Sequence, residues 1–315
     1  MKPDSTVIYF TVCSGTGYGI ITSLMIIFFQ NDANISQNIK IIFAIISYFL
    51  IVSGLLSSTL HLGHPKRAWR ALSQWRSSWL SREGVAAIIT FIPLTIFFIL
   101  WIFANQIKVT FLFLIVSSIF SIITTLCTAK IYSSIKAIPA WNNPLVPIIY
   151  ILNSLVIGFL FTLTVLFYFR LKNDMLSNII ILLCLTTLFI KILYWYSIKK
   201  PSKSNIATAI GLGTKDKTTF FEGPHTNKNY LSTEMINEIK IFKSFFLRVI
   251  VCTFAYLTPA YYLFQLPYFI MSDYVISYSL IIISFFAIIG MFIERYLFFI
   301  ESKHTVSLYY GKKTI

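Results

Sequence analysis

The sequence predicts an all-α integral membrane protein with eight transmembrane helices and an interfacial amphipathic helix between the second and third. Apolar residue types make up 57% of the 315 residues and charged types only 12%, and the mean hydropathy is +0.77. A soluble protein does not carry so large an apolar fraction. A helix needs roughly 20 apolar residues to cross about 30 Å of hydrocarbon, and the chain offers stretches of that length eight times.

Polar residues interrupt the apolar stretches and set the ends of the spans. Asn31 and Asp32 follow the first stretch, and Asp273 separates the seventh from the eighth. The first apolar run is too long for a secretory signal peptide, so we expect it to be a retained helix. We therefore expect one polytopic membrane domain over 1–315 with a long loop over 199–244. The expected spans are 6–29, 39–60, 84–103, 109–131, 147–169, 176–198, 245–268 and 274–299.

Lysine and arginine are unevenly distributed between the two sets of loops. Of the 26 basic residues, 19 fall in the two tails and the even-numbered loops, whereas 4 fall in the odd-numbered loops. The positive-inside rule then places both termini and the sixth loop on the cytoplasmic side. The net charge of +15 reflects this topology, and we expect no nucleic-acid partner.

Neither the cysteines nor the histidines form a pattern that predicts a metal site. The cysteines all fall inside apolar spans, without Cys-x-x-Cys spacing: Cys13, Cys127, Cys184 and Cys252. Such cysteines behave as small apolar residues. The histidines all lie at helix ends or in loops, where they cannot form an axial haem pair inside the membrane: His61, His64, His225 and His304. We expect no metal and no haem, and the plausible electron carrier is a lipid-soluble quinone.

The first span contains three glycines at alternate positions: Gly15, Gly17 and Gly19. The run superficially resembles a potassium-channel filter, but a filter is a re-entrant loop and this run lies within a spanning helix. Small residues at such spacing are typical of close contact between neighbouring helices.

The second loop carries the densest polar chemistry. Gly63 and Pro65 end the second span, and tryptophans then recur every three or four residues with arginines between them. This pattern predicts an amphipathic helix on the membrane surface. One interpretation is a simple interfacial anchor, because Trp and Arg are common at that depth. The other is a quinol site, because two imidazoles, a carboxylate and several guanidiniums flank the start of the third span.

Quinol chemistry needs proton acceptors of the kind this loop supplies. Oxidation of a hydroquinone releases two protons and two electrons, so the site needs a base. A histidine, with an ordinary pKa of about 6.5, can accept one proton, and Glu83 can take or relay another.

The stretch from His61 to Glu83 resembles the DmsC-like family, the membrane anchor subunit of dimethyl sulfoxide reductase. The shared features are His-Leu-Gly, Pro65, Arg67-Ala68 and the run Ser-Trp-Leu-Ser-Arg-Glu over 78–83. The sixth loop adds Ala-Thr-Ala-Ile-Gly-Leu-Gly over 207–213 and Pro-His-Thr over 224–226. The number of spans and the length also match, so the resemblance covers the whole chain.

The resemblance implies a haem-free quinol dehydrogenase subunit of the bacterial cytoplasmic (inner) membrane that oxidises menaquinol in anaerobic respiration. Electrons would pass to a four-cluster iron–sulfur subunit and then to a molybdopterin catalytic subunit, so this chain would hold neither cofactor and reduce no S-oxide itself. The family's quinol-linked His and Glu carry over onto His61 and Glu83. We add four candidate pocket residues with weaker support: His64, Arg67, Arg82 and Arg248.

Ionisable residues also lie within the spans. Lys191 is either part of a proton or ion path or an anchor that snorkels to the interface, and Tyr194 and Trp195 beside it favour the anchor. Glu294 and Arg295 are expected to point to different faces of the eighth span and to pair with other helices. The long loop is expected either to pack against a soluble partner or to be a basic, flexible connection.

Two alternatives compete with the quinol-oxidising anchor. A polytopic transporter should show inverted repeats and broken helices at mid-membrane, and the sequence contains no convincing repeat. A purely structural anchor would have no quinol site, and replacement of His61 or Glu83 would then leave electron transfer intact.

Overall fold

The computed structural model describes residues 4–30, 35–60, 64–104, 107–199, 205–211, 218, 241–268 and 272–310. Within them, eight helices are long and apolar enough to cross a membrane, as predicted. They are α1 (Ser5–Phe29), α2 (Gln37–Leu60), α3 (Trp79–Phe103), α4 (Ile107–Ser133), α5 (Leu145–Tyr168), α6 (Asp174–Lys199), a composite seventh span (Phe242–Tyr268) and α11 (Asp273–Ile300).

The seventh span is not a uniform α-helix. It consists of α9 (Ile241–Val251), the π-helix η2 (Cys252–Leu257), α10 (Thr258–Gln265) and the short 3₁₀-helix η3 (Leu266–Tyr268). Pro259, in the first turn of α10, has no backbone N–H and crowds the preceding turn. This explains why the backbone hydrogen bonds there span five residues, as in a π-helix, instead of four. The π-helix lies against α11, where a Cβ on Gly290 would come within 2.8 Å of the Ala255 nitrogen.

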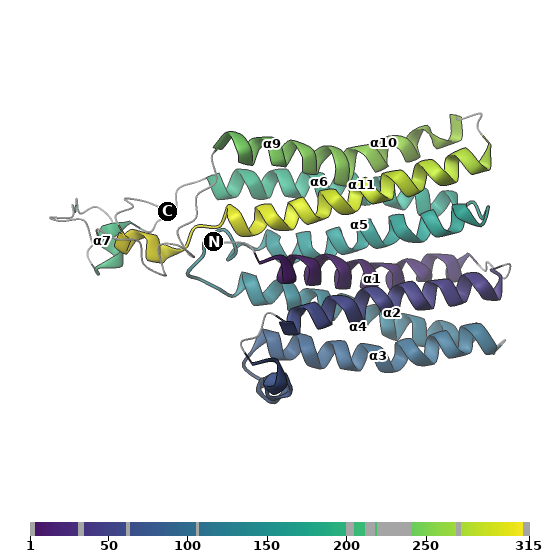
Figure 1. Cartoon of the computed structure of the whole chain (residues 1–315), viewed down its shortest axis with the longest axis horizontal. Helices are drawn as coiled ribbons and strands as arrows, with labels where there is room; N and C mark the ends of the chain where they lie inside the picture. Colours follow the sequence, from purple (N-terminus) through teal and green to yellow (C-terminus); the bar gives the residue numbers. More distant parts are fainter. Residues whose placement is uncertain are drawn as a thin grey trace.

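Short helices lie outside the spans. The predicted interfacial helix is present as η1 (Pro65–Gln74), a 3₁₀-helix rather than an α-helix, and it exposes 67% of Trp69. The remaining short helices of the described ranges are α7 (Ile206–Ala209) and η4 (Thr305–Tyr310). Both ends of the described chain lie at the same end of the bundle (Figure 1), as an even number of spans requires. We call this end the termini end; η1, which joins α2 to α3, lies there too.

The eight spans form two groups of four. In the first group, α1 packs on α2 and α4, and α3 packs on α4; in the second, α5 packs on α6 and α11, and the seventh span packs on α11. Figure 1 shows the two groups as layers that meet where α1 lies against α5. Because α1 also contacts α4 and α11, it is the central helix, and most of its residues are buried.

Close contact between α1 and α5 joins the two groups. The Ser154 hydroxyl donates to the Gly15 carbonyl at 2.6 Å, and the Ser23 and Thr162 hydroxyls lie 2.5 Å apart. Each pair is separated by 139 residues, so the two helices run parallel. A Cβ on Gly19 would come within 2.0 Å of the Ser154 carbonyl oxygen. The small residues of the first span therefore mediate close helix packing, as their spacing predicts.

Candidate functional site

Glu83 is buried inside the first group of helices, one turn from the start of α3. Hydropathy predicts that the third span begins at residue 84, just after Glu83. In the structure α3 begins at Trp79, because the Ser78 side chain caps the helix by accepting from the Ser81 N–H. Only 4% of Glu83 is exposed, and Thr128 on α4 donates its hydroxyl proton to Oε1. A carboxyl group at this depth is costly, so it is a functional candidate by default.

Arg82 turns toward the second loop and is not brought together with Glu83. Its guanidinium donates to the carbonyl oxygens of Trp75 at 3.0 Å and Arg76 at 2.6 Å, and lies 4.3 Å from the centre of the Trp79 ring. These contacts fasten the end of the second loop to α3. The structure therefore gives this candidate pocket residue a structural role.

The other second-loop candidates are not assembled around Glu83 in the described residues. His64 and Arg67 are both exposed at the start of η1, where the Arg67 N–H donates to the His64 carbonyl at 2.9 Å. His61, the strongest candidate besides Glu83, lies outside the described residues. Most of the long sixth loop, including His225, also lies outside them.

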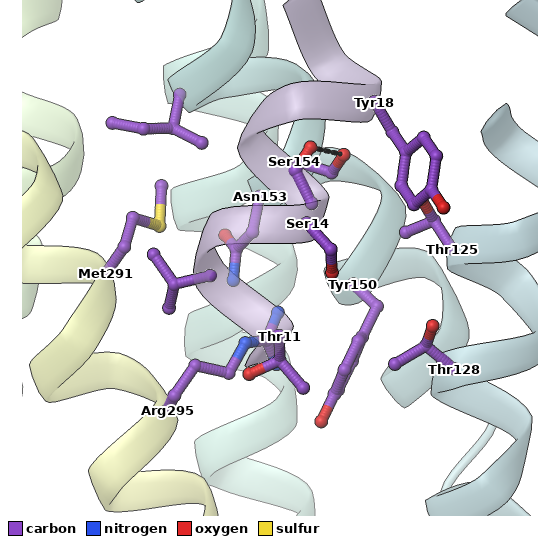
Figure 2. Close-up of a pocket in the computed structure, with 13 residues that line it drawn as sticks. Thr11, Ser14, Tyr18, Thr125, Thr128, Tyr150, Asn153, Ser154, Met291 and Arg295 are labelled. Atoms are coloured by element: carbon purple, nitrogen blue, oxygen red, sulfur yellow. Dashed lines mark hydrogen bonds between the residues drawn. The ribbon is translucent and has the colours of Figure 1, made fainter. Parts of the chain in front are cut away.

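A small cavity lies behind Glu83, between the two groups of helices. Figure 2 shows side chains of α1, α4, α5 and α11 converging on it. Thr128 links the two features, because its hydroxyl contacts Glu83 and its side chain lines the cavity. The polar side chains that line it are Thr11, Ser14, Tyr18, Thr125, Thr128, Tyr150, Asn153, Ser154 and Arg295.

The second group of helices contains a buried group of three charges on the far side of this cavity. Lys191 on α6 binds the Glu294 carboxylate on α11, and Arg295 Nε lies 3.4 Å from the other oxygen of Glu294. Lys191 is only 1% exposed, so the expectation that it snorkels to the interface is wrong. Glu294 does pair with another helix as expected, but it also contacts Arg295, because both side chains turn inward.

Arg295 extends from this group of charges to the cavity. Its guanidinium carbon lies 3.6 Å from the centre of the Tyr150 ring on α5, and the side chain lines the cavity. Stacking of this kind is worth more when both groups are shielded from water.

Arg248 lies elsewhere and does not reach the cavity. It pairs with Glu301 at 2.8 Å and stacks on Trp195 at 5.3 Å from the ring centre, near the ends of the seventh span and α11. Ser244 donates to the same Glu301 carboxylate. The structure thus separates this candidate pocket residue from Glu83.

Comparison with known proteins identifies the family. A family model described as the DMSO reductase anchor subunit (DmsC) matches residues 1–311. The chain belongs to the DmsC family. Membership makes it a multi-pass membrane anchor subunit of an oxidoreductase complex that has catalytic and electron-transfer partners.

A curated relative extends the comparison within the DmsC family. This chain is 26% identical to a sulfite dehydrogenase subunit of Allochromatium vinosum over 330 aligned positions, which cover 98% of this chain and 99% of the relative. DmsC anchors therefore accompany enzymes with different substrates, and the family alone does not define the substrate of the partner.

Several cavity residues of this DmsC chain were not recognised in the sequence. Tyr18, Tyr150 and Asn153 sit within apolar spans, and hydropathy gives no reason to single them out. The spacing of polar and small residues could have indicated them: such residues recur at 11, 14, 15 and 18, and again at 150, 153 and 154. That spacing marks one polar face on each helix.

Proposed function

We propose that this chain is the quinol-reactive anchor of a molybdopterin oxidoreductase complex, with Glu83 exchanging protons with the quinol. Electrons from menaquinol would pass to a partner iron–sulfur subunit and on to the catalytic subunit. The observation that carries the proposal is the burial of Glu83 beside Thr128 at the termini end, next to the second loop.

The chemistry balances at this site. Quinol oxidation yields the quinone, two protons and two electrons; the electrons leave through the partner, and Glu83 takes one proton as general base. His61, in the second loop, takes the other proton in this proposal. Neither residue needs a metal or haem, in agreement with the expectation that the electron-carrying cofactors belong to the partners.

The direction of electron flow is set by the partner enzyme. A DMSO reductase consumes electrons, and quinol would supply them. A sulfite dehydrogenase, the activity named for the relative, removes electrons from its substrate, and its anchor would then reduce a quinone. Glu83 would serve both directions, accepting a proton in one and donating it in the other.

The arrangement of the spans is relevant to the transporter alternative. The two groups of four are parallel where they meet, since α1 and α5 contact each other at a constant separation of 139 residues. An inverted repeat would place the matching helices in opposite directions, so the two groups are not related as an inverted repeat.

The buried carboxylate of Glu83 favours the quinol-reactive anchor over the purely structural anchor.

The decisive experiment measures oxidation of a menaquinol analogue by membranes that contain the whole complex. Glu83→Gln and His61→Ala are expected to abolish quinol-driven turnover while an artificial electron donor still supports the catalytic subunit. Asp174→Asn, which removes an exposed carboxylate in the first turn of α6, is the matched control. If quinol-driven turnover persists in both variants of an assembled complex, the proposal is rejected and the purely structural anchor is favoured.

A further inference from the structure

The cavity behind Glu83 is formed by matching positions of the two groups of helices. The separation of 139 residues that relates Gly15 to Ser154 also relates three further pairs of cavity-lining positions of α1 and α5. These pairs are Thr11 with Tyr150, Ser14 with Asn153, and Tyr18 with Ile157. The remaining walls come from α4 and α11, the fourth span of each group. The cavity therefore exists only when both groups are packed together.

Four polar atoms around this cavity lack a hydrogen-bond partner of normal geometry among the described residues. They are the hydroxyls of Tyr18 and Tyr150, Nδ2 of Asn153 and Nη1 of Arg295. All four side chains line the cavity, and all are more than nine-tenths buried. Each unpaired donor in the bilayer interior carries a desolvation cost of about 1–3 kcal/mol. Tyr18 has Thr124 as a hydrogen-bonding neighbour and Tyr150 has Arg295, but none of the four atoms makes a bond of normal geometry. This shortfall indicates that something polar occupies the space between them.

The available space fits water. The space open to the centre of a water molecule measures about 20 Å³, and a buried water needs at least about 10–15 Å³ and two to four polar partners. A quinone ring is far too large for this space. The hydroxyls of Thr11, Ser14 and Thr128 supply acceptors beside the unpaired donors.

The charges on the two sides of the cavity are complementary. Within the described part of the chain, Glu294 is the single carboxylate that contacts both Lys191 and Arg295, so this buried group carries one excess positive charge when all three are ionised. Glu83, across the cavity, is a buried carboxyl group whose hydrogen-bond donor Thr128 lines the same space. An ionised Glu83 would offset the excess charge.

We propose that the cavity binds ordered water that joins Glu83, through Thr128, to Arg295, and that Arg295 is a positioning residue for the proton of Glu83. The proposal rests on the proposed function, in which Glu83 exchanges protons with quinol. The guanidinium charge and the water together favour the carboxylate, so Glu83 releases its proton once the quinol has been oxidised.

Arg295 is the buried cation best placed for this role. The titratable groups that lie within electrostatic reach of Glu83 are Tyr18 on α1, Cys127 and Tyr132 on α4, and Tyr150 on α5. Arg82, next to Glu83 in the chain, acts on Cys127. The tyrosines and the cysteine are uncharged at neutral pH, and Arg82 is bound to the second loop. The groups around Arg295 are Glu294, Lys191, Tyr132, Tyr150 and Tyr256.

The first test follows the Glu83 carboxyl band by infrared difference spectroscopy during a pH titration of the purified complex. The band is assigned by its loss in Glu83→Gln. Removal of the positive charge in Arg295→Gln favours the protonated form, so the midpoint should move to higher pH by about one unit. Arg295→Lys keeps the positive charge, so its midpoint should lie close to that of the native complex. Arg248→Gln removes a cation that does not reach the cavity, and it should leave the midpoint unchanged.

An unchanged midpoint in Arg295→Gln would reject the coupling even if Glu83 is essential for quinol oxidation, so the two proposals fail separately. Asn153→Leu provides a second variant if Arg295→Gln does not assemble. It removes a donor and fills the cavity, and it should also move the midpoint upward; no shift there would likewise reject the proposal.

The second test is a map of the intact complex at a resolution that shows water. Density for water is expected within hydrogen-bonding distance of Asn153 Nδ2 and Arg295 Nη1, and it should vanish in Asn153→Leu. An empty cavity, or a halide revealed by its anomalous signal after bromide exchange, would overturn the assignment.

Discussion

The hydroxyl of Thr128 on α4 donates a hydrogen bond to the buried carboxylate of Glu83 on α3. This contact links two helices of the first group at the point where the second loop enters the bundle. The same threonine side chain lines the cavity shared by both groups of helices. Its position makes Thr128 a direct way to perturb Glu83 without changing its charge.

Replacement of this threonine by valine should slow quinol-driven turnover by roughly 10- to 100-fold, because a hydrogen bond to a charged group is worth about 1.5–3 kcal/mol and each 1.4 kcal/mol is about tenfold in rate. Turnover with an artificial donor should stay at the native level. Thr186→Val is the matched control, because the exposed Thr186 hydroxyl bonds, within the described ranges, only to backbone carbonyls of its own helix. Equal rates in the two variants would show that the Thr128 contact does not support the reaction.

The contact between α1 and α5 should tolerate no added side chain at Gly158. A Cβ there would lie 2.3 Å from the Gly19 carbonyl carbon, so Gly158→Ala should push the two groups of helices apart. We expect a loss of about 1–3 kcal/mol or more in stability, seen as a lower temperature of unfolding in detergent. Gly15→Ala is the control, because a Cβ there would meet Ser154 at 3.6 Å, an ordinary contact. Similar unfolding temperatures for the two variants would contradict this packing.

The buried charges should respond unequally to neutralisation. Glu294→Gln leaves both Lys191 and Arg295 without their carboxylate, so we expect a loss of roughly 3–5 kcal/mol and poor accumulation in the membrane. Lys191→Met leaves Glu294 paired with Arg295 and should cost clearly less. The measurement is the yield of folded protein and its unfolding temperature in detergent.

An exposed ion pair at the opposite end of the bundle provides the control for these variants. Lys172 and Asp273 lie 3.0 Å apart with 59% and 43% of their side chains exposed. Asp273→Asn should therefore change stability by less than about 1 kcal/mol. If Lys191→Met were as harmful as Glu294→Gln, the carboxylate would not be shared between two cations.

The second loop should loosen when Arg82 is replaced. Arg82→Gln removes the guanidinium contacts to the Trp75 and Arg76 carbonyls and to the Trp79 ring. Proteases should then cut the stretch 64–78 several times faster in detergent, because local opening costs less when such contacts are lost. Arg67→Gln, at an exposed position of η1, should leave the cleavage rate unchanged. Equal cleavage of both variants would mean that Arg82 does not hold the loop.

The sequence was sufficient to predict the spans but not how their faces meet. Long apolar stretches and the polar residues between them determined the eight helices, because the thickness of the bilayer leaves little freedom in their length. The exception is α3, which extends back to Trp79 because the Ser78 cap starts it earlier than hydropathy indicates. The interfacial helix was also recognisable from its tryptophans, although not its 3₁₀ geometry.

The site was only partly predictable for a physical reason. Motif and chemistry singled out Glu83, but hydropathy cannot tell which face of a span meets which neighbour. Arg248 and Lys191 illustrate this limit: each finds its carboxylate on α11 or just after its end, a partner more than 50 residues away in the sequence. The cavity depends on such distant pairings, so it became visible only in the folded chain.

The parallel packing of α1 and α5 has a consequence for biosynthesis. Helix α1 is synthesised before α5, yet the glycine-lined face that includes Gly19 is covered only when α5 arrives. Until then, lipid or an insertion factor must shield a surface shaped for another backbone. The first four spans therefore enter the membrane as an incomplete assembly, and a stall in translation before α5 would leave a product prone to mispairing and to quality-control proteolysis.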